Sequence, residues 1–339
     1  MNAVLLTCAV ISTIDLSGYV EARPYVAWND STSFLGYNRG WLEFRSDESK
    51  YGAQVALDLI VPYDTLTFGH ALDNIDISRL AVWLGSENAR VIAGKQSLYW
   101  GVGRVFRPLD IFNRTNYFEP GYERAGANAL LAYLSIGGLS SLRGILAPRG
   151  NIDNTLAGGR FGMNVASNDI GITAMHQSSE ELTVIGGEIT GELALGYWAE
   201  FAYTWQDTLD HSKLSVGVDY TLPIGIYAMI EYFFDGSGVS DPADYDFTQI
   251  AYGYRQTLAQ HYVYASIGLF QNPFLRPAFN VIANLNDGGL IIIPQITYAL
   301  FDNAEVTAGI NYAFGTDESE FLNIMEYRGA AYLWARVYF

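Results

Sequence analysis

The chain has 339 residues, with 36 acidic side chains against 19 lysines and arginines, so its net charge is −17. This charge argues against a nucleic-acid partner. Half of the residues are hydrophobic, yet no apolar run of about 20 residues, the length that a membrane-spanning helix needs, follows the first dozen residues. Cys8 is the only cysteine, which excludes a disulfide framework and a thiolate metal site.

The first twelve residues differ from the rest of the chain. Ala3 to Ile11 are mostly apolar and carry no charge, as in the hydrophobic centre of an export signal, although no basic residue precedes them. We expect residues 1–12 to be the remnant of such a signal and residues 13–339 to form one domain, because no linker or change in composition divides them.

From residue 14 onward, polar and apolar side chains alternate with a period of two. Ser17, Tyr19 and Glu21, for example, interleave with Gly18 and Val20. This period is typical of strands that have one apolar and one wetter face, and segments of about ten residues suit a transmembrane β-barrel. The predicted strands are 14–28, 37–47, 50–63, 74–85, 88–101, 126–138, 140–148, 155–167, 169–178, 181–192, 194–206, 211–222, 224–235, 260–270, 275–285, 289–300, 304–315 and 329–339.

The pattern therefore predicts an all-β fold, a closed antiparallel transmembrane barrel of about eighteen strands, with sixteen as the alternative count. An even number places both termini at the same end of a barrel. Segment 246–257 could form a further strand, but counting it would send Phe339 to the opposite end, so we assign 236–259 to an outer loop. Residues 64–73, 102–125 and 316–328 are the other long loops, and short turns join the strands at the other end.

One predicted strand alternates poorly. Asp76 and Arg79 fall on opposite faces of strand 74–85 unless a β-bulge intervenes.

Charged side chains on the wetter faces gather in two groups. The basic group comprises Arg23, Arg39, Arg45, Lys50 and Arg336, and the acidic group comprises Glu188, Glu192, Glu200, Asp219 and Glu231. The first strand lies opposite the tenth in a ring of eighteen, so a basic wall would face an acidic wall across the lumen and orient dipolar solutes. The alternative is a set of locally paired charges that only hold the barrel wall together.

The loop 102–125 combines charges of both signs with aromatic residues such as Phe106 and Phe112. Its charged residues are Arg104, Arg107, Asp110, Arg114, Glu119, Glu123 and Arg124. This composition suits a loop that folds into the lumen and narrows it; the alternative is a solvated surface loop.

Two stretches resemble bacterial outer-membrane porin-like barrels. Gly94-Lys-Gln, Trp100-Gly and Arg107-Pro-Leu-Asp110 follow a pattern seen in that family, and the alternating strand 329–339 ends on Phe339, like the closing strand of these barrels. The resemblance implies the outer membrane of a Gram-negative-type bacterium, no cofactor, and an early loop that constricts the pore. It also implies that the barrel-assembly machinery reads the last strand and that a homotrimer is one assembly open to the chain.

The leading functional hypothesis is passive diffusion of small hydrophilic solutes or ions. The alternatives are a substrate-specific outer-membrane transporter or exporter, in which Tyr227, Tyr262, Tyr264, Trp334 and Tyr338 would suit sugars or apolar solutes, and a structural barrel that hosts a partner protein. We do not expect an enzyme or a metal site, because the histidines at 70, 176, 211 and 261 share no ligand spacing. Asp241, Asp244 and Asp246 could hold Ca²⁺, but three such residues are more often a solvated acidic loop.

Overall fold

The computed structural model describes residues 14–47, 50–63, 75–112, 126–207, 209–252, 255–325 and 327–339. These residues contain eighteen strands, and each overlaps one predicted strand. The strands are β1 (Asp15–Trp28), β2 (Thr32–Asp47), β3 (Tyr51–Pro62), β4 (Ile75–Gly85), β5 (Ala89–Gln96), β6 (Ala127–Ile136), β7 (Ser140–Arg149), β8 (Asn151–Val165), β9 (Asn168–Gln177), β10 (Leu182–Glu192), β11 (Gly196–Trp205), β12 (His211–Thr221), β13 (Tyr227–Asp235), β14 (His261–Gly268), β15 (Leu275–Asn284), β16 (Leu290–Phe301), β17 (Ala304–Phe314) and β18 (Gly329–Tyr338).

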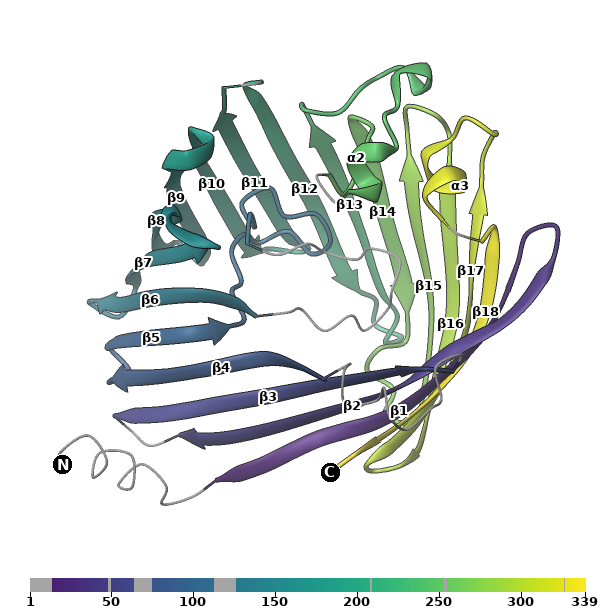
Figure 1. The fold of residues 1–339 in the computed structure, drawn as a ribbon, viewed down its shortest axis with the longest axis horizontal. Helices are drawn as coiled ribbons and strands as arrows, with labels where there is room; N and C mark the ends of the chain where they lie inside the picture. Colours follow the sequence, from purple (N-terminus) through teal and green to yellow (C-terminus); the bar gives the residue numbers. More distant parts are fainter. Residues whose placement is uncertain are drawn as a thin grey trace.

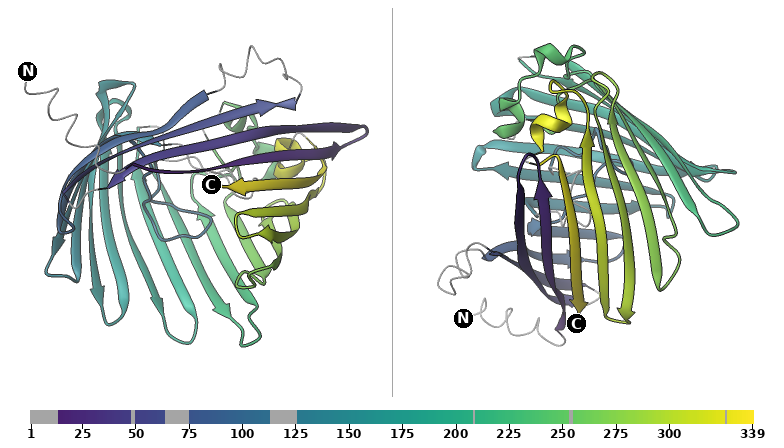
Figure 2. Two further views of the ribbon diagram at one scale, coloured as in Figure 1. Left: turned by 90° about the horizontal axis from the view of Figure 1, so that it is seen from below. Right: turned by 90° about the vertical axis from the view of Figure 1, so that its right-hand side faces the viewer.

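The strands form one closed antiparallel ring, which confirms the predicted barrel (Figure 1). Each strand pairs with the next along the chain, and β18 returns to pair with β1, where Glu21 lies opposite Arg336. Phe339 and Gly18 exchange two backbone hydrogen bonds of 3.0 Å beyond the last strand residue. Closure gives every described strand a hydrogen-bonded neighbour on both sides, as a barrel in lipid requires. β1 begins and β18 ends at the same end of the barrel (Figure 2).

The two faces of the sheet differ in polarity. Outward positions expose large apolar side chains such as Val20, Leu84 and Ile172, whereas the interior side holds buried charged residues such as Glu21 and Glu231. A soluble protein would place its apolar side chains inside. This inverted arrangement suits a barrel that contacts lipid outside and water inside.

A β-bulge at Ser78 explains the irregular fourth strand. Ala56 pairs with Arg79, while the next residue, Leu57, pairs with Ile77, so Ser78 has no partner on β3. The extra residue restores the alternation, and both Asp76 and Arg79 then point to the interior side, where Arg79 meets the Glu43 carboxylate at 3.4 Å.

The long connections lie at the end of the barrel opposite the termini. The loop between β13 and β14 contains η4 (Pro242–Asp244) and α2 (Thr248–Ala251), and the loop between β17 and β18 contains α3 (Glu320–Ile324); η3 (Ser178–Glu180) joins β9 to β10. The described residues of segment 246–257 therefore form no strand, as predicted. No helix in the described ranges has the length and apolarity needed to cross a bilayer. The predicted loop 64–73 lies outside the described residues.

Candidate functional site

The segment that follows β5 lies against the interior face of the barrel wall, on the side formed by β10–β13. Its first anchor is Glu200 of β11. One carboxylate oxygen accepts the backbone N–H groups of Val102 and Gly103 at 2.7 and 2.9 Å, and the other accepts that of Leu109 at 2.6 Å. A single side chain thus holds two points of the loop that lie seven residues apart.

The second anchor is Glu231 of β13, which is 0% exposed. Its carboxylate accepts the backbone N–H groups of Arg104 at 2.7 Å, Val105 at 3.2 Å and Phe106 at 2.6 Å. It also accepts the indole N–H of Trp198 at 2.8 Å. Burying a carboxylate without a lysine or arginine partner is costly, but several hydrogen bonds to the charged form offset that cost.

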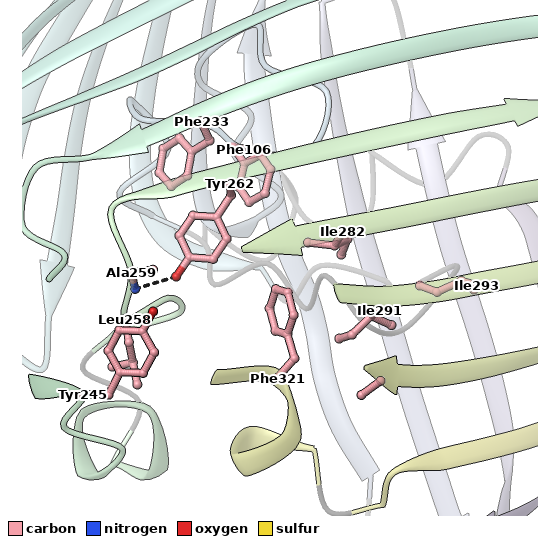
Figure 3. Close-up of a cluster of buried hydrophobic side chains, with 11 residues drawn as sticks. Phe106, Phe233, Tyr245, Leu258, Ala259, Tyr262, Ile282, Ile291, Ile293 and Phe321 are labelled. Atoms are coloured by element: carbon pink, nitrogen blue, oxygen red, sulfur yellow. Dashed lines mark hydrogen bonds between the residues drawn. The ribbon is translucent and has the colours of Figure 1, made fainter. Parts of the chain in front are cut away.

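Apolar contacts hold the same segment from both sides. The ring of Phe106 stacks on Phe233 at a centroid distance of 4.7 Å and lies near Tyr262, as Figure 3 shows. Leu109 packs against Val184 and Ala202. Phe106 and Leu109 thus each belong to a cluster of buried hydrophobic side chains. The loop is therefore docked by hydrophobic contacts of two residues, Phe106 and Leu109, that also take part in its polar anchors.

One glycine permits the close approach of this loop to the wall, and a second permits a close contact within the loop itself. A Cβ atom on Gly101, whose φ is +87°, would lie 2.4 Å from both carboxylate oxygens of Glu200, and a Cβ atom on Gly103 would lie 1.8 Å from the carbonyl oxygen of Phe106. The Gly101-Val-Gly103 sequence was the available signal for this contact. It indicates that the backbone approaches something closely, but the partner of Gly101, Glu200, lies about one hundred residues away in the chain.

The described charged residues of the loop take different positions. The guanidinium of Arg104 lies 5.2 Å from the Trp198 ring centroid and 3.8 Å from the Asp219 carboxylate. Arg107 turns back and donates from Nε to the Gly103 carbonyl at 2.6 Å, and the Asp110 backbone N–H donates to the Arg107 carbonyl at 3.1 Å. Arg114, Glu119, Glu123 and Arg124 lie outside the described residues.

The predicted basic wall consists largely of ion pairs. Glu21 lies between two arginines, with Arg23 at 2.7 Å and Arg336 at 2.7 Å. Arg39 donates twice to Asp58, both times at 2.8 Å. Arg45 and Lys50 are more exposed. Arg45 forms an ion pair of 2.8 Å with Asp47, and Lys50 lies outside the strands. Pairing within the wall weakens any field that these arginines could project across the lumen.

The predicted acidic residues also differ from one another. Glu200 and Glu231 anchor the loop, and Glu188 binds Arg160, whose Nε donates to it at 2.6 Å. Asp219 accepts a hydrogen bond from the Tyr227 hydroxyl at 2.9 Å. Glu192 is exposed at the end of β10. The sequence indicated which of these carboxylates lie on the interior side, but not that two of them would bind a loop.

Three interior arginines escaped the sequence analysis. Arg90 of β5 and Arg143 of β7 both lie in register with Tyr133 of β6, one on each side of it, and Arg160 of β8 lies opposite Arg143. The four residues therefore form one row across β5–β8. Reading strands one at a time does not reveal such a row, because it depends on the offset between neighbouring strands.

A buried polar network joins three outer connections near the mouth of the barrel. Glu320 of α3 accepts hydrogen bonds from the Leu258 backbone N–H at 2.8 Å, the Tyr262 hydroxyl at 2.5 Å and the Asn284 side chain at 2.8 Å. Asp287 accepts the backbone N–H of Glu320 at 2.8 Å. Burial raises the pKa of the Glu320 carboxyl to about 7, although these hydrogen bonds act in the opposite direction.

Hydrophobic side chains pack beside this network, on the interior side of β13–β17. Phe321 of α3 and Tyr245 and Leu258 of the β13–β14 loop cover Ile282 and Ile291 of the sheet, among others (Figure 3). The two long loops are therefore packed into this side of the barrel mouth.

No cluster of three histidine, cysteine or acidic side chains suited to a metal ion occurs within the described part of the chain. In the predicted acidic loop, Asp241 accepts the Ala243 backbone N–H at 3.0 Å, and Asp246 accepts that of Thr248 at 3.1 Å. Asp241 caps η4, and Asp246 precedes the N-cap residue of α2 by one position.

Comparison of the structure with solved structures identifies the fold. The Pseudomonas aeruginosa OccK2 (OpdF) structure in complex with glucuronate has a TM-score of 0.65 and 10% identity, covering 97% of each chain. Acinetobacter baumannii OccAB1 gives 0.64 and 10%, again covering 97% of each chain. Salmonella typhi OmpF in complex with daunomycin gives 0.53 and 11%, covering 96% of this chain and 97% of that chain. No protein-family model and no curated protein sequence matches the chain. The chain has the fold of bacterial outer-membrane porin-like barrels.

Proposed function

We propose that the protein is an outer-membrane channel for passive diffusion of small hydrophilic solutes or ions in a Gram-negative-type bacterium. A closed ring of eighteen strands is wide enough to leave an aqueous lumen. The apolar exterior fits the hydrocarbon region, and the charged interior fits water. The resemblance of the fold to porin-like channels supports the same conclusion.

The observation that carries the proposal is the capture of the loop after β5 by Glu200 and Glu231. A loop attached through its backbone to the opposite part of the wall narrows the lumen and leaves the Arg104 side chain, which is 54% exposed, to face the solute. The constriction would comprise Arg104, Arg107 and Asp110 with the remaining charged residues of loop 102–125, namely Arg114, Glu119, Glu123 and Arg124. The two sets of wall charges would set the ion preference.

We expect two kinds of protein contact in addition to outer-membrane lipid. The closing strand, which ends on Phe339, would be recognised by the barrel-assembly machinery, and a homotrimer is the assembly that we would test first. Both expectations rest on the family resemblance.

Conductance in a planar bilayer tests the proposed function. Purified protein should give ohmic single-channel steps. Arg104→Ala should shift the reversal potential in a KCl gradient toward cation preference, because it removes a positive charge from the docked loop. Arg328→Ala, which removes an exposed arginine from the β17–β18 loop, is the matched control. Protein that inserts as a folded barrel and never conducts would contradict the proposal.

A further inference from the structure

The barrel wall splits between β6 and β7 at the end that carries the long loops. The last rung that the two strands share there joins Leu130 to Leu146. Residues 127–129 of β6 and 147–149 of β7 do not pair with each other, although the first still pair with β5 and the second with β8. The ring as a whole therefore stays closed, while a local gap opens in its wall.

Pro148 explains why the ladder between β6 and β7 ends. In an antiparallel sheet, the backbone groups of successive residues point to alternate neighbouring strands. The Leu139 carbonyl accepts the Asn164 N–H of β8 at 2.8 Å, so the odd-numbered residues of β7 face β8 and the even-numbered ones face β6. Pro148 thus faces β6 and has no N–H for the rung that it would form with Asn128.

A cavity of about 590 Å³ fills this gap on the lipid-facing side of the wall. Leu130 and Leu146 flank it and are 44% and 49% exposed, as outward side chains are. The other lining residues are Gly94, Asn128, Ala129, Pro148 and Thr155. Only Asn128 and Thr155 contribute polar side chains, so the cavity suits hydrocarbon better than water. Its volume lies within the range of about 300–1,000 Å³ that is usual for small-molecule sites.

A hydrophobic cluster closes the cavity on the side of the lumen. Leu98 and Trp100, from the segment after β5, are both 2% exposed and belong to one cluster with Ala129 and Ala147. Ala129 also lines the cavity, so the cluster lies directly behind it. An occupant therefore enters from the bilayer, and a solute in the lumen does not reach this site.

Polar groups lie beside the cavity at its outer edge. Lys95 is opposite Asn128 in the β5–β6 register, and its amine lies 3.2 Å from the Asp76 carboxylate. By the same alternation along the strand, the backbone N–H of Asn128 faces the gap, and it has no acceptor on β7. A molecule with a hydrocarbon chain in the cavity would place its polar end next to these groups. An apolar slot with a polar outer edge matches the shape of a membrane lipid.

We propose that this cavity binds one acyl chain of a bilayer lipid, which seals the wall where β6 and β7 do not pair. The chain would lie along Leu130 and Leu146, and an ester or phosphate oxygen of the lipid would accept the Asn128 N–H, which otherwise faces hydrocarbon without a partner on β7. The inference goes beyond the proposed channel function and does not depend on conduction, because the cavity lies outside the lumen.

Native mass spectrometry of the barrel, extracted into mild detergent from vesicles, tests the site. The vesicles contain palmitoyl-oleoyl phosphatidylethanolamine in one series and palmitoyl-oleoyl phosphatidylglycerol in the other. We expect the wild type to retain a single lipid. Thr155→Phe, whose ring would occupy the cavity, should show a roughly tenfold smaller lipid-bound fraction, which corresponds to about two methylene groups removed from the contact.

Thr183→Phe is the matched control, because it makes the same change at an outward position of β10 away from this cavity, and it should retain the lipid. Asn128→Phe fills the cavity from the opposite strand and provides the same test if Thr155→Phe does not fold. Heat-dependent migration on gels reports whether each variant is a folded barrel.

Loss of the lipid in the cavity-filling variants, with retention in Thr183→Phe, supports the inference. A wild type that retains no lipid, or cavity-filling variants that retain as much as Thr183→Phe, overturns it. Peaks at twice the barrel mass that vanish in Thr155→Phe would show instead that a second copy covers the gap. Retention of added palmitate but of neither phospholipid would assign the cavity to a free amphiphile and would likewise overturn the inference.

Discussion

The ring of Phe106 lies flat against the ring of Phe233, with centroids 4.7 Å apart and planes 3° from parallel. This stack attaches the loop after β5 to β13, which is formed more than one hundred residues later. Phe106→Ala should weaken docking by about 3–5 kcal/mol, because the ring is almost fully buried and nothing can fill its place. Hydrogen exchange of the Val102–Leu109 amides should become faster while the strand amides stay protected. Phe301→Ala, at an exposed ring on the end of β16, should change neither.

Glu231 should control how firmly the pore loop is held. Glu231→Ala would leave the N–H groups of Arg104, Val105 and Phe106 and the indole of Trp198 without their acceptor, at about 1.5–3 kcal/mol for each hydrogen bond to the charged group. We expect larger and noisier single-channel currents. Glu180→Ala, in the exposed η3 turn, should leave the currents unchanged. A quiet channel of wild-type conductance in Glu231→Ala would show that the loop does not constrict the pore.

Substitutions at Gly101 and Gly225 distinguish the steric clash of an added Cβ atom from the backbone strain of a positive φ. Gly101→Ala places a methyl group 2.4 Å from the Glu200 carboxylate at a φ of +87°, while Gly225→Ala introduces the same residue at a φ of +83° with no atom within 4 Å. Both variants carry similar backbone strain of roughly 1–2 kcal/mol. Only Gly101→Ala should increase hydrogen exchange at Val102 and Gly103 and alter conductance. Equal behaviour of the two variants in these measurements would argue that contact with Glu200 is unimportant.

The network around Glu320 should make the outer loops pH-dependent. The folded pKa of about 7 lies above the ordinary glutamate value of 4.5, so the folded loops favour the protonated acid. Its stabilising contribution is complete below about pH 4.5 and is lost as the pH rises through about 7, by about 3 kcal/mol in total. Limited proteolysis within residues 315–325 should therefore become faster from pH 5 to pH 8.

Glu320→Gln should remove most of this pH dependence, because its side chain cannot ionise. Glu318→Gln, which changes an exposed carboxylate two residues away, should keep the wild-type slope. If Glu320→Gln and the wild type show the same slope, another group must titrate.

Much of the fold could be predicted because the relevant signal is local. The number of strands follows from alternation between residues i and i+2, and the exclusion of segment 246–257 follows from the requirement that an even-stranded barrel bring Phe339 back to the end where β1 starts. The bulge at Ser78 was likewise implied, since Asp76 and Arg79 are both polar and only an extra residue places them on one face.

The candidate site was only partly predictable. Glu200 and Glu231 were assigned to the interior side, yet nothing near them in the sequence indicates that they accept backbone N–H groups from a loop about one hundred residues earlier. Similarly, Arg23 and Arg336 looked like members of a basic wall, and their shared partner Glu21 becomes apparent only when β18 closes on β1.

The sequence by itself determined which side chains face lipid and which face the lumen, because that depends on the geometry of single strands. Only the tertiary structure decided which interior charges neutralise one another and where the loop docks. The physical reason is that the offset between neighbouring strands and the closure of the ring set the distances between interior side chains, and both arise from contacts across the whole barrel.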